Sequence, residues 1–449
     1  MTDNSRLSNE IANPLKGRGL IIAAPSSGSG KTTITLGLLR VMARQDINIS
    51  SAKAGPDYID PQFHKKASRQ ECVNLDPWAM RAGYLQELAH GLASTGPLLV
   101  EGMMGLFDGA MDGSGSVADL ANLLGLPIVL VVDAAKQSHS IAALVEGFIN
   151  HRKDIQIAGI ILNKVGSPRH EAMLRAALEK YGVTVFGAVL RNEALAMPER
   201  HLGLVQADER EDLEAFVSHA ADSIENSLDM KSLLNAFSPL KQTDIQSITK
   251  LLPLGQKIAV ARDRAFAFSY PHIINGWREQ GAEISFFSPL NDEAPKLDAD
   301  AVYLPGGYPE LHAGKLAANK KFMAGLTNHA QKNTLIYGEC GGYMVLGDGL
   351  IDKSGQCHKM AGLLPLTTSY EHPKLHLGYR KVIPVKSFPM VEENTSMRAH
   401  EFHYSSVEGI EKGEHLFKIC DAMGNNNSTT GSRRSNVMGS FIHLIDIWK

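Results

Sequence analysis

The sequence predicts two α/β domains in tandem, of which the first is doubly wound. Short, continuous apolar runs alternate with stretches of helical spacing in the first half of the chain. Such runs are typical of strands covered on both faces, as in a parallel sheet, and their alternation with helices indicates βαβ units. A second alternating series begins at residue 257, and 449 residues are enough for two hydrophobic cores.

Five apolar runs are the strands expected in the first domain, and the spacing predicts a helix over 32–44 after the first of them. The runs are Gly19–Ala24, Leu98–Glu101, Pro127–Asp133, Ile157–Asn163 and Thr184–Leu190. Between 212 and 256 the sequence changes to one or two amphipathic helices followed by a polar stretch. We therefore expect domains over 18–211 and 257–449, separated by a helical segment and linker over 212–256.

The second domain repeats the pattern with its own series of short apolar strands. They are Lys257–Ala261, Glu283–Phe287, Ala301–Leu304, Thr334–Gly338 and a last strand, Val437–Leu444. Before that last strand, the biased segment GNNNSTTGSRR at 424–434 is expected to form a mobile surface loop.

Composition excludes several classes of protein. The formal net charge of −3 gives no indication of a nucleic-acid partner. No apolar run reaches the roughly 18 residues of a membrane span, and the polar start of the chain lacks the apolar region of a secretory signal. The 4 cysteines have no paired spacing, which favours a reducing compartment. We expect a soluble cytoplasmic protein.

A phosphate-binding loop is predicted at 24–33, APSSGSGKTT, because it follows a strand and opens a helix. Glycines let backbone N–H groups converge on phosphate oxygens, the lysine reaches the β/γ-phosphates, and the threonine after it holds Mg²⁺. Pro25 stands where the strict pattern has its first glycine. The predicted nucleotide-binding residues are Gly28, Ser29, Gly30, Lys31, Thr32 and Thr33, with Asn163 at the end of a later strand as a candidate contact to the base.

Acidic residues occur in two other stretches of the same domain. Asp57 and Asp60 lie in GPDYIDP, and Glu101 and Asp108 lie in VEGMMGLFDG. Because the carboxyl ends of parallel strands share one crevice, these acids are expected to gather near the phosphates, where carboxylate oxygens suit Mg²⁺. The alternative is that an aspartate in a turn bonds only its own backbone.

A second chemical signal is Cys340 in YGECGGYMVLG. The stretch fits a strand–turn–helix elbow that exposes a nucleophile between glycines. The alternative is a buried structural cysteine, which is the usual fate of a free thiol. The elbow by itself leaves both open.

Nine motifs that occur in order along the chain extend this pattern over roughly residues 18–446. They are APSSGSGKTT, KAGPDYIDP, NLDPWAM, VEGMMGLFDG, RHLGL, YLPGGYPE, GECGGYMVLG, HEFHYS and GSFIHL. Together they resemble the corrinoid a,c-diamide synthases, glutamine-dependent enzymes that amidate hydrogenobyrinate or cobyrinate in cobalamin synthesis. The first half is similar to P-loop domains of the dethiobiotin-synthetase type, and the second half resembles class I glutamine amidotransferases.

The resemblance implies ATP-dependent amidation with glutamine as the nitrogen donor, and it implies roles for particular residues. ATP and Mg²⁺ would bind at the loop of 28–32, with Thr32, Asp57 and Glu101 as metal ligands. Asp57, Tyr58, Asp60 and Asp108 would lie beside the corrinoid carboxylates. Cys340 would be the glutaminase nucleophile, His443 its base, and the N–H groups of Gly341 and of Gly306 or Gly307 the oxyanion donors.

Two features stay open at this point. Class I amidotransferases commonly carry His-x-Glu, whereas here the run is His443-Leu444-Ile445-Asp446, so the third member is unassigned and Asp446 is a weak candidate. The cluster His400, Glu401, His403 and Tyr404 fits solvated loop residues or residues of a glutamine site or interface equally well.

Alternatives remain for the substrate and for the class of protein. Within the family, several stretches favour the metal-free substrate, hydrogenobyrinate, over cobyrinate, and cobyric acid synthase shares the two-domain plan. A regulatory P-loop ATPase with a dead amidotransferase domain would lack the nucleophile or the base, and both are present. The order of the two amidations, the ammonia path and a homodimer are not decided by the sequence.

Overall fold

The computed structural model describes residues 15–196, 199–200, 203–204, 206–210, 212–242, 248–392, 394–408 and 414–448. The polar start of the chain, which was used to exclude a secretory signal, lies outside these residues, as does part of RHLGL, one of the nine family motifs. Two compact units are present, which are described separately: one holds Met1–Trp78, Ala82–Gly109 and Gly113–Gln246, and the other Ala79–Arg81, Ala110–Asp112 and Ser247–Lys449. No helix of the described part is long and apolar enough to cross a membrane.

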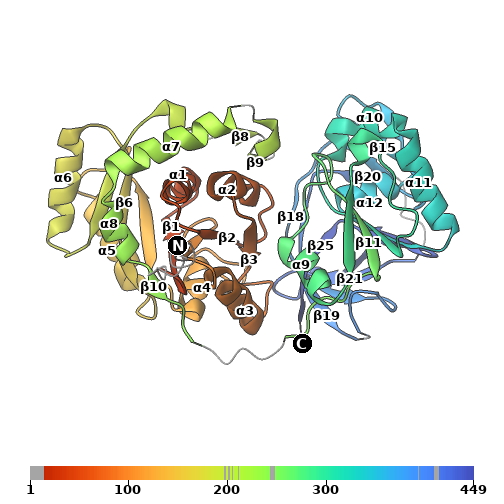
Figure 1. The fold of residues 1–449 in the computed structure, drawn as a ribbon, viewed down its shortest axis with the longest axis horizontal. Helices are drawn as coiled ribbons and strands as arrows, with labels where there is room; N and C mark the ends of the chain where they lie inside the picture. Colours follow the sequence, from red (N-terminus) through yellow and green to blue (C-terminus); the bar gives the residue numbers. More distant parts are fainter. Residues whose placement is uncertain are drawn as a thin grey trace, which may run out of the picture. The chain divides into compact units, whose positions relative to one another are not determined.

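The first unit is built on a parallel sheet with the strand order β3-β2-β4-β1-β5-β6-β7, and β10 pairs antiparallel with the start of β1 (Figure 1). The strands are β1 Arg18–Ala23, β2 Ser50–Ala54, β3 Cys72–Leu75, β4 Leu98–Glu101, β5 Ile128–Asp133, β6 Ile157–Val165, β7 Val185–Leu190 and β10 Ser238–Pro239, with a separate pair, β8 Glu199–Arg200 and β9 Gly203–Leu204. The chain leaves the central β1 in both directions, so a crevice opens at the carboxyl ends of the central strands.

Helices cover this sheet and connect its strands. They are α1 Lys31–Arg44, α2 Asp60–Ser68, α3 Ala82–Ala93, α4 Val117–Leu124, α5 Ile141–His151, α6 Pro168–Glu179, α7 Leu213–Ser227 and α8 Met230–Asn235, with the 3₁₀ turns η1 Glu193–Leu195 and η2 Ala207–Glu209. The five predicted strands are all present within one or two residues of the expected bounds. Sequence periodicity missed β2 and β3, because SSAKA has no apolar run and CVNL is short.

Helix α7, expected in a separate segment between the domains, instead packs on α1 within the first unit. In Figure 1, α7 passes above α1, which is seen nearly end-on. A Cβ on Gly37 of α1 would lie 2.5 Å from Ile224 Cγ1 and 2.8 Å from the Ala220 carbonyl oxygen, so the two helices approach closely where α1 has no side chain. An ion pair of Arg40 with Glu214 joins them as well.

The second unit is built on three sheets. A six-stranded sheet has the order β12-β11-β13-β14-β24-β23, parallel except for β23; a five-stranded antiparallel sheet has the order β22-β21-β18-β19-β25; and a small sheet has the order β16-β15-β17-β20. The elements are β11 Lys257–Ala261, α9 Pro271–Glu279, β12 Glu283–Phe287, η3 Pro289–Asn291, β13 Ala301–Leu304, η4 Pro309–His312, α10 Ala313–Ala318, α11 Lys320–Gln331, β14 Leu335–Glu339, α12 Gly341–Leu346, β15 Gly349–Ile351, β16 Cys357–Lys359, β17 Thr367–Ser369, β18 His376–Pro384, β19 Ser396–His403, β20 Ser406–Glu408, β21 Phe417–Cys420, β22 Ser428–Thr430, β23 Ser432–Arg434, β24 Val437–Ser440 and β25 Ile442–Trp448.

Two expectations for the end of the chain are wrong. The predicted loop at 424–434 contains β22 and β23, which are polar strands at the edges of their sheets. They are held by backbone pairing with the neighbouring strand and not by an apolar face, so the apolar pattern of the sequence could not predict them. The single strand predicted over Val437–Leu444 is two strands that meet at Phe441. Because β24 lies in the parallel sheet and β25 in the antiparallel sheet, the chain changes sheets two residues before His443.

Candidate active sites

The phosphate loop of the first unit joins β1 to α1, as its sequence predicts. Gly28 and Gly30 have φ of +77° and +91°, in the left-handed region that favours glycine. A Cβ on Gly30 would lie 2.2 Å from Asn163 Nδ2, so the loop also needs glycine there for its close approach to β6. Asn163 donates a hydrogen bond to the Ser29 carbonyl oxygen at 2.8 Å. The amide predicted to touch the base therefore braces the loop.

Lys31 and Thr32, the first residues of α1, reach the loop after β4 and the end of β4, respectively. The Lys31 ammonium donates to the Met104 carbonyl oxygen at 2.6 Å, and the Thr32 hydroxyl donates to Glu101 Oε1 at 2.6 Å. Burial lowers the pKa of Lys31, and nearby Lys53 adds to this effect. The cation is thus held in a partly dry site, where its attraction to an anion is stronger than in water.

Glu101 is the centre of a buried ionic cluster that sequence reasoning found only in part. Its carboxylate is fully buried and pairs with Lys53 Nζ at 2.8 Å and with His64 Nε2 at 2.6 Å. Burial acts against the charged carboxylate, but Lys53 and His64 more than offset this and hold the pKa of Glu101 well below its ordinary value. The signal that could have found Lys53 is a lysine placed on a strand with small neighbours, SSAKA, directly before GPDYIDP.

Three acids and a tyrosine expected beside the substrate take different positions. Asp60 is buried and pairs with Lys53 at 2.5 Å, and burial and then Asp57 raise the pKa of Asp60 to about 7. Asp57 caps the start of α2, because its Oδ1 accepts hydrogen bonds from the Ile59 and Asp60 N–H groups at 2.7 and 3.1 Å. Tyr58 is buried as well.

Asp108 differs from this group because it is exposed and accepts a hydrogen bond from the Gly105 N–H at 2.8 Å. Its charge raises the pKa of Lys31, which places it near the phosphate loop. Glu101, Asp60, Asp57 and Asp108 all contribute to the electrostatics of Lys31 or Lys53. The expected gathering of acids around the loop is thus present, with two lysines among them.

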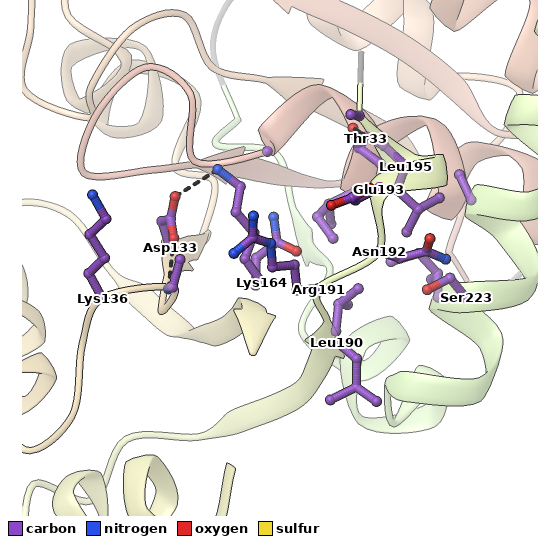
Figure 2. A pocket seen from close by; sticks show the side chains of 18 residues that line it. Thr33, Asp133, Lys136, Lys164, Leu190, Arg191, Asn192, Glu193, Leu195 and Ser223 are labelled. Carbon is purple, nitrogen blue, oxygen red and sulfur yellow. Dashed lines mark hydrogen bonds and ion pairs between the residues drawn. The ribbon is translucent and has the colours of Figure 1, made fainter. Parts of the chain in front are cut away.

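A cavity of about 380 Å³ opens beside the phosphate loop in the first unit (Figure 2). It is lined by Gly30 of the loop and Thr33 of α1, by the ends of β5, β6 and β7, by most of the residues of 191–196, and by α7. Lys164 spans its rim, donating to the Gly28 carbonyl oxygen and to Asp133, each at 2.7 Å. The cavity has the size of a small-molecule site and continues from the phosphate loop.

The second unit holds Cys340 at a strained turn between β14 and α12. Its φ of +46° and ψ of −106° lie outside the regions that L-residues favour. Glycines pack tightly on either side: a Cβ on Gly342 would lie 2.0 Å from the Leu304 carbonyl oxygen, and one on Gly338 2.8 Å from the Tyr343 nitrogen. The geometry is that of the elbow which the sequence predicts.

His443 reaches the same point from β25. A Cβ on Gly306 would lie 2.4 Å from His443 Cε1 and 3.2 Å from Cys340 Cβ, so these two side chains flank one glycine. The thiol donates to the Phe402 carbonyl oxygen at 3.5 Å. Burial raises the pKa of the Cys340 thiol, with Glu310 adding to the shift, and burial lowers the pKa of His443 to about 3. Burial thus favours the neutral thiol and the neutral imidazole.

The predicted oxyanion donors also lie together. Against the larger effect of burial, the Gly341 N–H acts to lower the pKa of the Cys340 thiol. A Cβ on Gly341 would lie 3.0 Å from the Gly307 nitrogen, and one on Gly307 would lie 2.0 Å from the Ala265 carbonyl oxygen. Glycine at both positions therefore lets two backbone segments meet beside the thiol.

Asp446, the weak candidate for the third member, is engaged elsewhere in the second unit. Its carboxylate accepts hydrogen bonds from the Arg81 side chain, with distances of 2.9 Å to each oxygen. The acid near the base is Glu339, whose Oε2 lies 3.8 Å from His443 Nδ1. Sequence reasoning missed it, although a lone acid ending an apolar strand directly before the nucleophile is a usable signal.

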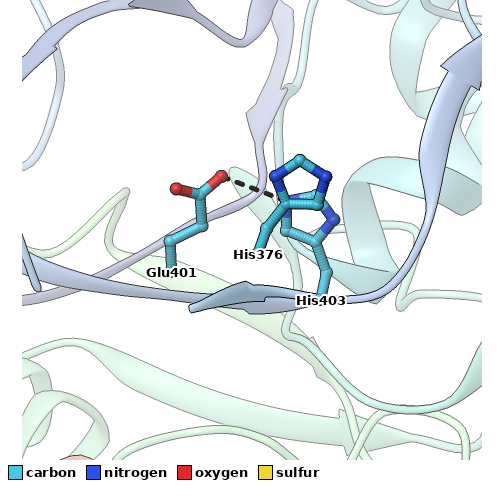
Figure 3. Close-up of side chains that lie close together, drawn as sticks. All are labelled: His376, Glu401 and His403. Carbon is cyan, nitrogen blue, oxygen red and sulfur yellow. Dashed lines mark hydrogen bonds and ion pairs between the residues drawn. The ribbon is translucent and has the colours of Figure 1, made fainter. Parts of the chain in front are cut away.

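The HEFHYS cluster is not a solvated loop, because His400, Glu401 and His403 are buried on β19. Figure 3 shows Glu401 beside the stacked rings of His403 and His376, and His403 Nε2 lies 3.0 Å from Glu401 Oε1. Ligand atoms of these three residues lie within 4.8 Å of one another, so they could hold a metal ion, although Arg380 already pairs with Glu401 at 2.7 Å. The same strand supplies the carbonyl of residue 402 to the Cys340 thiol, so it lines the thiol site.

Comparison with known proteins finds a family match for each half of the chain. Residues 20–205 match the CobQ/CobB/MinD/ParA nucleotide binding domain, and residues 257–446 match the CobB/CobQ-like glutamine amidotransferase domain. The chain is 57% identical to the hydrogenobyrinate a,c-diamide synthase of Brucella anthropi over 96% of its length and 98% of the relative.

Two further relatives with the same name are more distant. That of Rhizobium meliloti is 54% identical over 95% of this chain and 99% of its own, and that of Rhodobacter capsulatus is 47% identical over 95% and 98%. The chain belongs to the family of the hydrogenobyrinate a,c-diamide synthases, and it is a glutamine-dependent amidating ligase with a nucleotide-binding domain.

Proposed function

We propose that this protein converts the a and c carboxylates of hydrogenobyrinate into amides, using ATP to activate each carboxylate and glutamine to supply the nitrogen. The observation that carries the proposal is that one chain holds both a phosphate loop with Lys31 and a strained cysteine elbow with His443 beside it. Near full-length identity to synthases of that name supports the choice of substrate.

The activation step is assigned to the first unit. A carboxylate resists nucleophiles because its negative charge is delocalised, and transfer of the γ-phosphoryl group of ATP turns it into an acyl phosphate. Lys31 is positioned to neutralise charge on the transferred group, since its ammonium already donates to a carbonyl oxygen at the loop, which a phosphate oxygen can replace. The nucleoside would occupy the cavity that continues from the loop, with Asn163 bracing the turn.

Thr32, Asp57 and Glu101 offer the hard oxygen atoms that Mg²⁺ prefers. The fit is supported by the 2.6 Å contact between the Thr32 hydroxyl and Glu101 Oε1, which brings two such oxygens together next to the phosphate loop. Bound there, Mg²⁺ would neutralise phosphate charge during transfer. Lys53 and His64 hold Glu101 ionised and fix its orientation for this task.

Of the residues proposed to meet the corrinoid, Asp57 and Asp108 are the better placed. Asp57 is half-buried and Asp108 is exposed, whereas Asp60 and Tyr58 are buried. Asp60 would then act by holding Lys53 in place, through their 2.5 Å ion pair.

Ammonia release is assigned to Cys340 and His443. The imidazole takes the thiol proton, the thiolate attacks the amide carbon of glutamine, and the proton passes to the departing nitrogen, leaving a thioester and free ammonia. The N–H groups of Gly341 and Gly307 would stabilise the oxyanion. Water then hydrolyses the thioester to glutamate, and ammonia displaces phosphate from the acyl phosphate.

The neutral state of this pair predicts slow glutamine hydrolysis in the absence of the other substrates. Burial disfavours both the thiolate and the imidazolium, so glutamine or a conformational change must improve their solvation before attack. Glutamate release should rise when ATP and corrinoid are added together. Equally fast release without them would contradict this part of the proposal.

The substrate is tested with glutamine labelled with ¹⁵N at its side-chain amide, together with ATP, Mg²⁺ and one corrinoid at a time. Hydrogenobyrinate should take up two labelled nitrogens, each with release of phosphate, and faster than cobyrinate does. Preference for cobyrinate, or labelling only of a corrinoid whose a and c positions are already amides, would favour the two alternative substrates. ATP hydrolysis without labelling of any corrinoid would indicate a regulatory ATPase.

A further inference from the structure

A buried carboxylate lies directly behind the proposed glutaminase pair and has no role in the account above. Glu339 is the last residue of β14, directly before Cys340, and it is 2% exposed. Its Oε2 lies 3.8 Å from Nδ1 of His443. A base that faces the thiol through Nε2 has Nδ1 on the side of the ring away from the reaction. The run after His443 lacks the acid that commonly fills this place.

The position of this carboxylate is fixed by neighbours on three strands. The Tyr303 hydroxyl of β13 donates to Oε2 at 2.8 Å, and the Tyr337 hydroxyl of β14 donates to Oε1 at 3.1 Å. The Leu444 N–H of β25, next to His443, donates to Oε1 at 3.4 Å. The two tyrosines are cross-strand partners with stacked rings, so their hydroxyls converge on one point.

We propose that Glu339 is the positioning residue for His443, and that it replaces, from the strand before the nucleophile, the acid of the His-x-Glu pattern. This inference rests on the proposed roles of Cys340 and His443. When the imidazole takes the thiol proton, its Nδ1–H turns to Glu339, and the carboxylate stabilises the imidazolium. The contact of 3.8 Å shortens to a hydrogen bond in the glutamine complex, as catalytic hydrogen bonds often do.

The other reading of this cluster is a structural anchor that ties β13, β14 and β25 together. The two interpretations require different properties of residue 339. A positioning residue needs the negative charge beside His443, whereas an anchor needs the hydrogen bonds between the strands. Gln in place of Glu339 keeps the shape and can accept from one of the two tyrosines through its single carbonyl oxygen, but it lacks the charge. Phe in place of Tyr303 removes one of the bonds between strands and keeps the charge.

The test compares Glu339→Gln with Tyr303→Phe in the full-length enzyme, measuring glutamine-driven amidation, ammonium-driven amidation and the melting temperature. Loss of the charge should lower glutamine-driven kcat about 10- to 100-fold, with KM for glutamine and the ammonium-driven rate within about twofold of the parent. In Tyr303→Phe, the glutamine-driven kcat, the KM for glutamine and the ammonium-driven rate should stay within a few-fold of the parent.

The pH dependence supplies a readout that an anchor would not change. The groups that face Glu339 are Tyr303 on β13, Tyr337 on β14 and His443 on β25, and burial raises the pKa of Glu339 to about 7. The ratio of parent to Glu339→Gln activity with glutamine should therefore rise as pH increases through 7, because only the ionised parent orients the base.

Three outcomes overturn the inference. If the glutamine-driven activity of Glu339→Gln is close to that of the parent, the charge of Glu339 has no role in the reaction. Loss of both activities together with a lower melting temperature identifies an anchor, as does an equal loss in Tyr303→Phe. A Cys340→Ala enzyme that still uses glutamine would instead remove the proposed glutaminase site itself, so failure of the two proposals can be told apart.

Discussion

Two glutamates end parallel strands in the two halves of this molecule, and their pKa values are shifted in opposite directions. Glu101 ends β4 and Glu339 ends β14, and both are almost completely buried. The pKa of Glu101 lies well below its ordinary value because Lys53 and His64 outweigh burial, whereas burial raises the pKa of Glu339 to about 7 because its direct donors are neutral. The comparison teaches that the charge of the partners, more than depth, decides what a buried acid can do.

Each state suits the chemistry proposed beside it. Permanent ionisation of Glu101 fits a site for Mg²⁺ and phosphate, because a protonated carboxyl group would no longer bind the metal ion. A pKa near neutrality fits Glu339, because such a carboxylate can respond when the imidazole beside it gains a charge.

The largest effect is expected from removing the cation at Glu101. Lys53→Met leaves Glu101 and Asp60 buried without their shared lysine, which should cost about 3–5 kcal/mol of unfolding free energy. Urea denaturation at pH 7 measures this loss. Adding Glu101→Gln to the same chain should recover part of it, and a Lys53→Met variant as stable as the parent would contradict the assignment of a compensated charge.

A smaller effect, of opposite sign at the two sites, is expected from pH. Glu339 has a folded pKa of about 7, above its ordinary 4.5, so between these pH values the folded state binds more protons than the unfolded state. The free energy of unfolding therefore falls as pH rises through this range. Glu339→Gln should therefore gain stability relative to the parent between pH 5 and pH 8, by about 1–3 kcal/mol.

The matched variant at the other site is Glu101→Gln. Because the folded pKa of Glu101 is lowered, its contribution is present above its ordinary pKa and is lost as pH falls toward the folded value. The deficit of this variant should be largest near neutrality and shrink in acid. Denaturation curves that run parallel to those of the parent for both variants would contradict the comparison.

The smallest effect is expected from Tyr337→Phe, which removes one neutral donor from Glu339. A single hydrogen bond to a charged group is worth about 1.5–3 kcal/mol, but a carboxyl that is half protonated at pH 7 should lose only about 1 kcal/mol. Thermal unfolding at pH 6 and pH 8 measures it, with the larger loss expected at pH 8. An equal loss at the two pH values would show that the hydroxyl does not depend on the charge of Glu339.

The sequence predicted the elements and sites whose signals are local. Apolar runs identified strands such as β4, β11 and β13, and the glycine spacing identified both the phosphate loop and the cysteine elbow. It could not predict β2, whose small side chains leave room for the buried Lys53, because that burial depends on Glu101 from β4. The pairing of Glu339 with His443 was missed because β14 and β25 meet only after the chain changes sheets at Phe441.

The central claim, that a thiol supplies nitrogen in one unit while ATP activates a carboxylate in the other, is tested most directly by Cys340→Ala. Amide formation on hydrogenobyrinate is measured with ATP and Mg²⁺, first with glutamine and then with an ammonium salt in its place. The account predicts no product with glutamine and a rate near that of the parent with ammonium. Product with glutamine, or none from either source in a correctly folded variant, would contradict it.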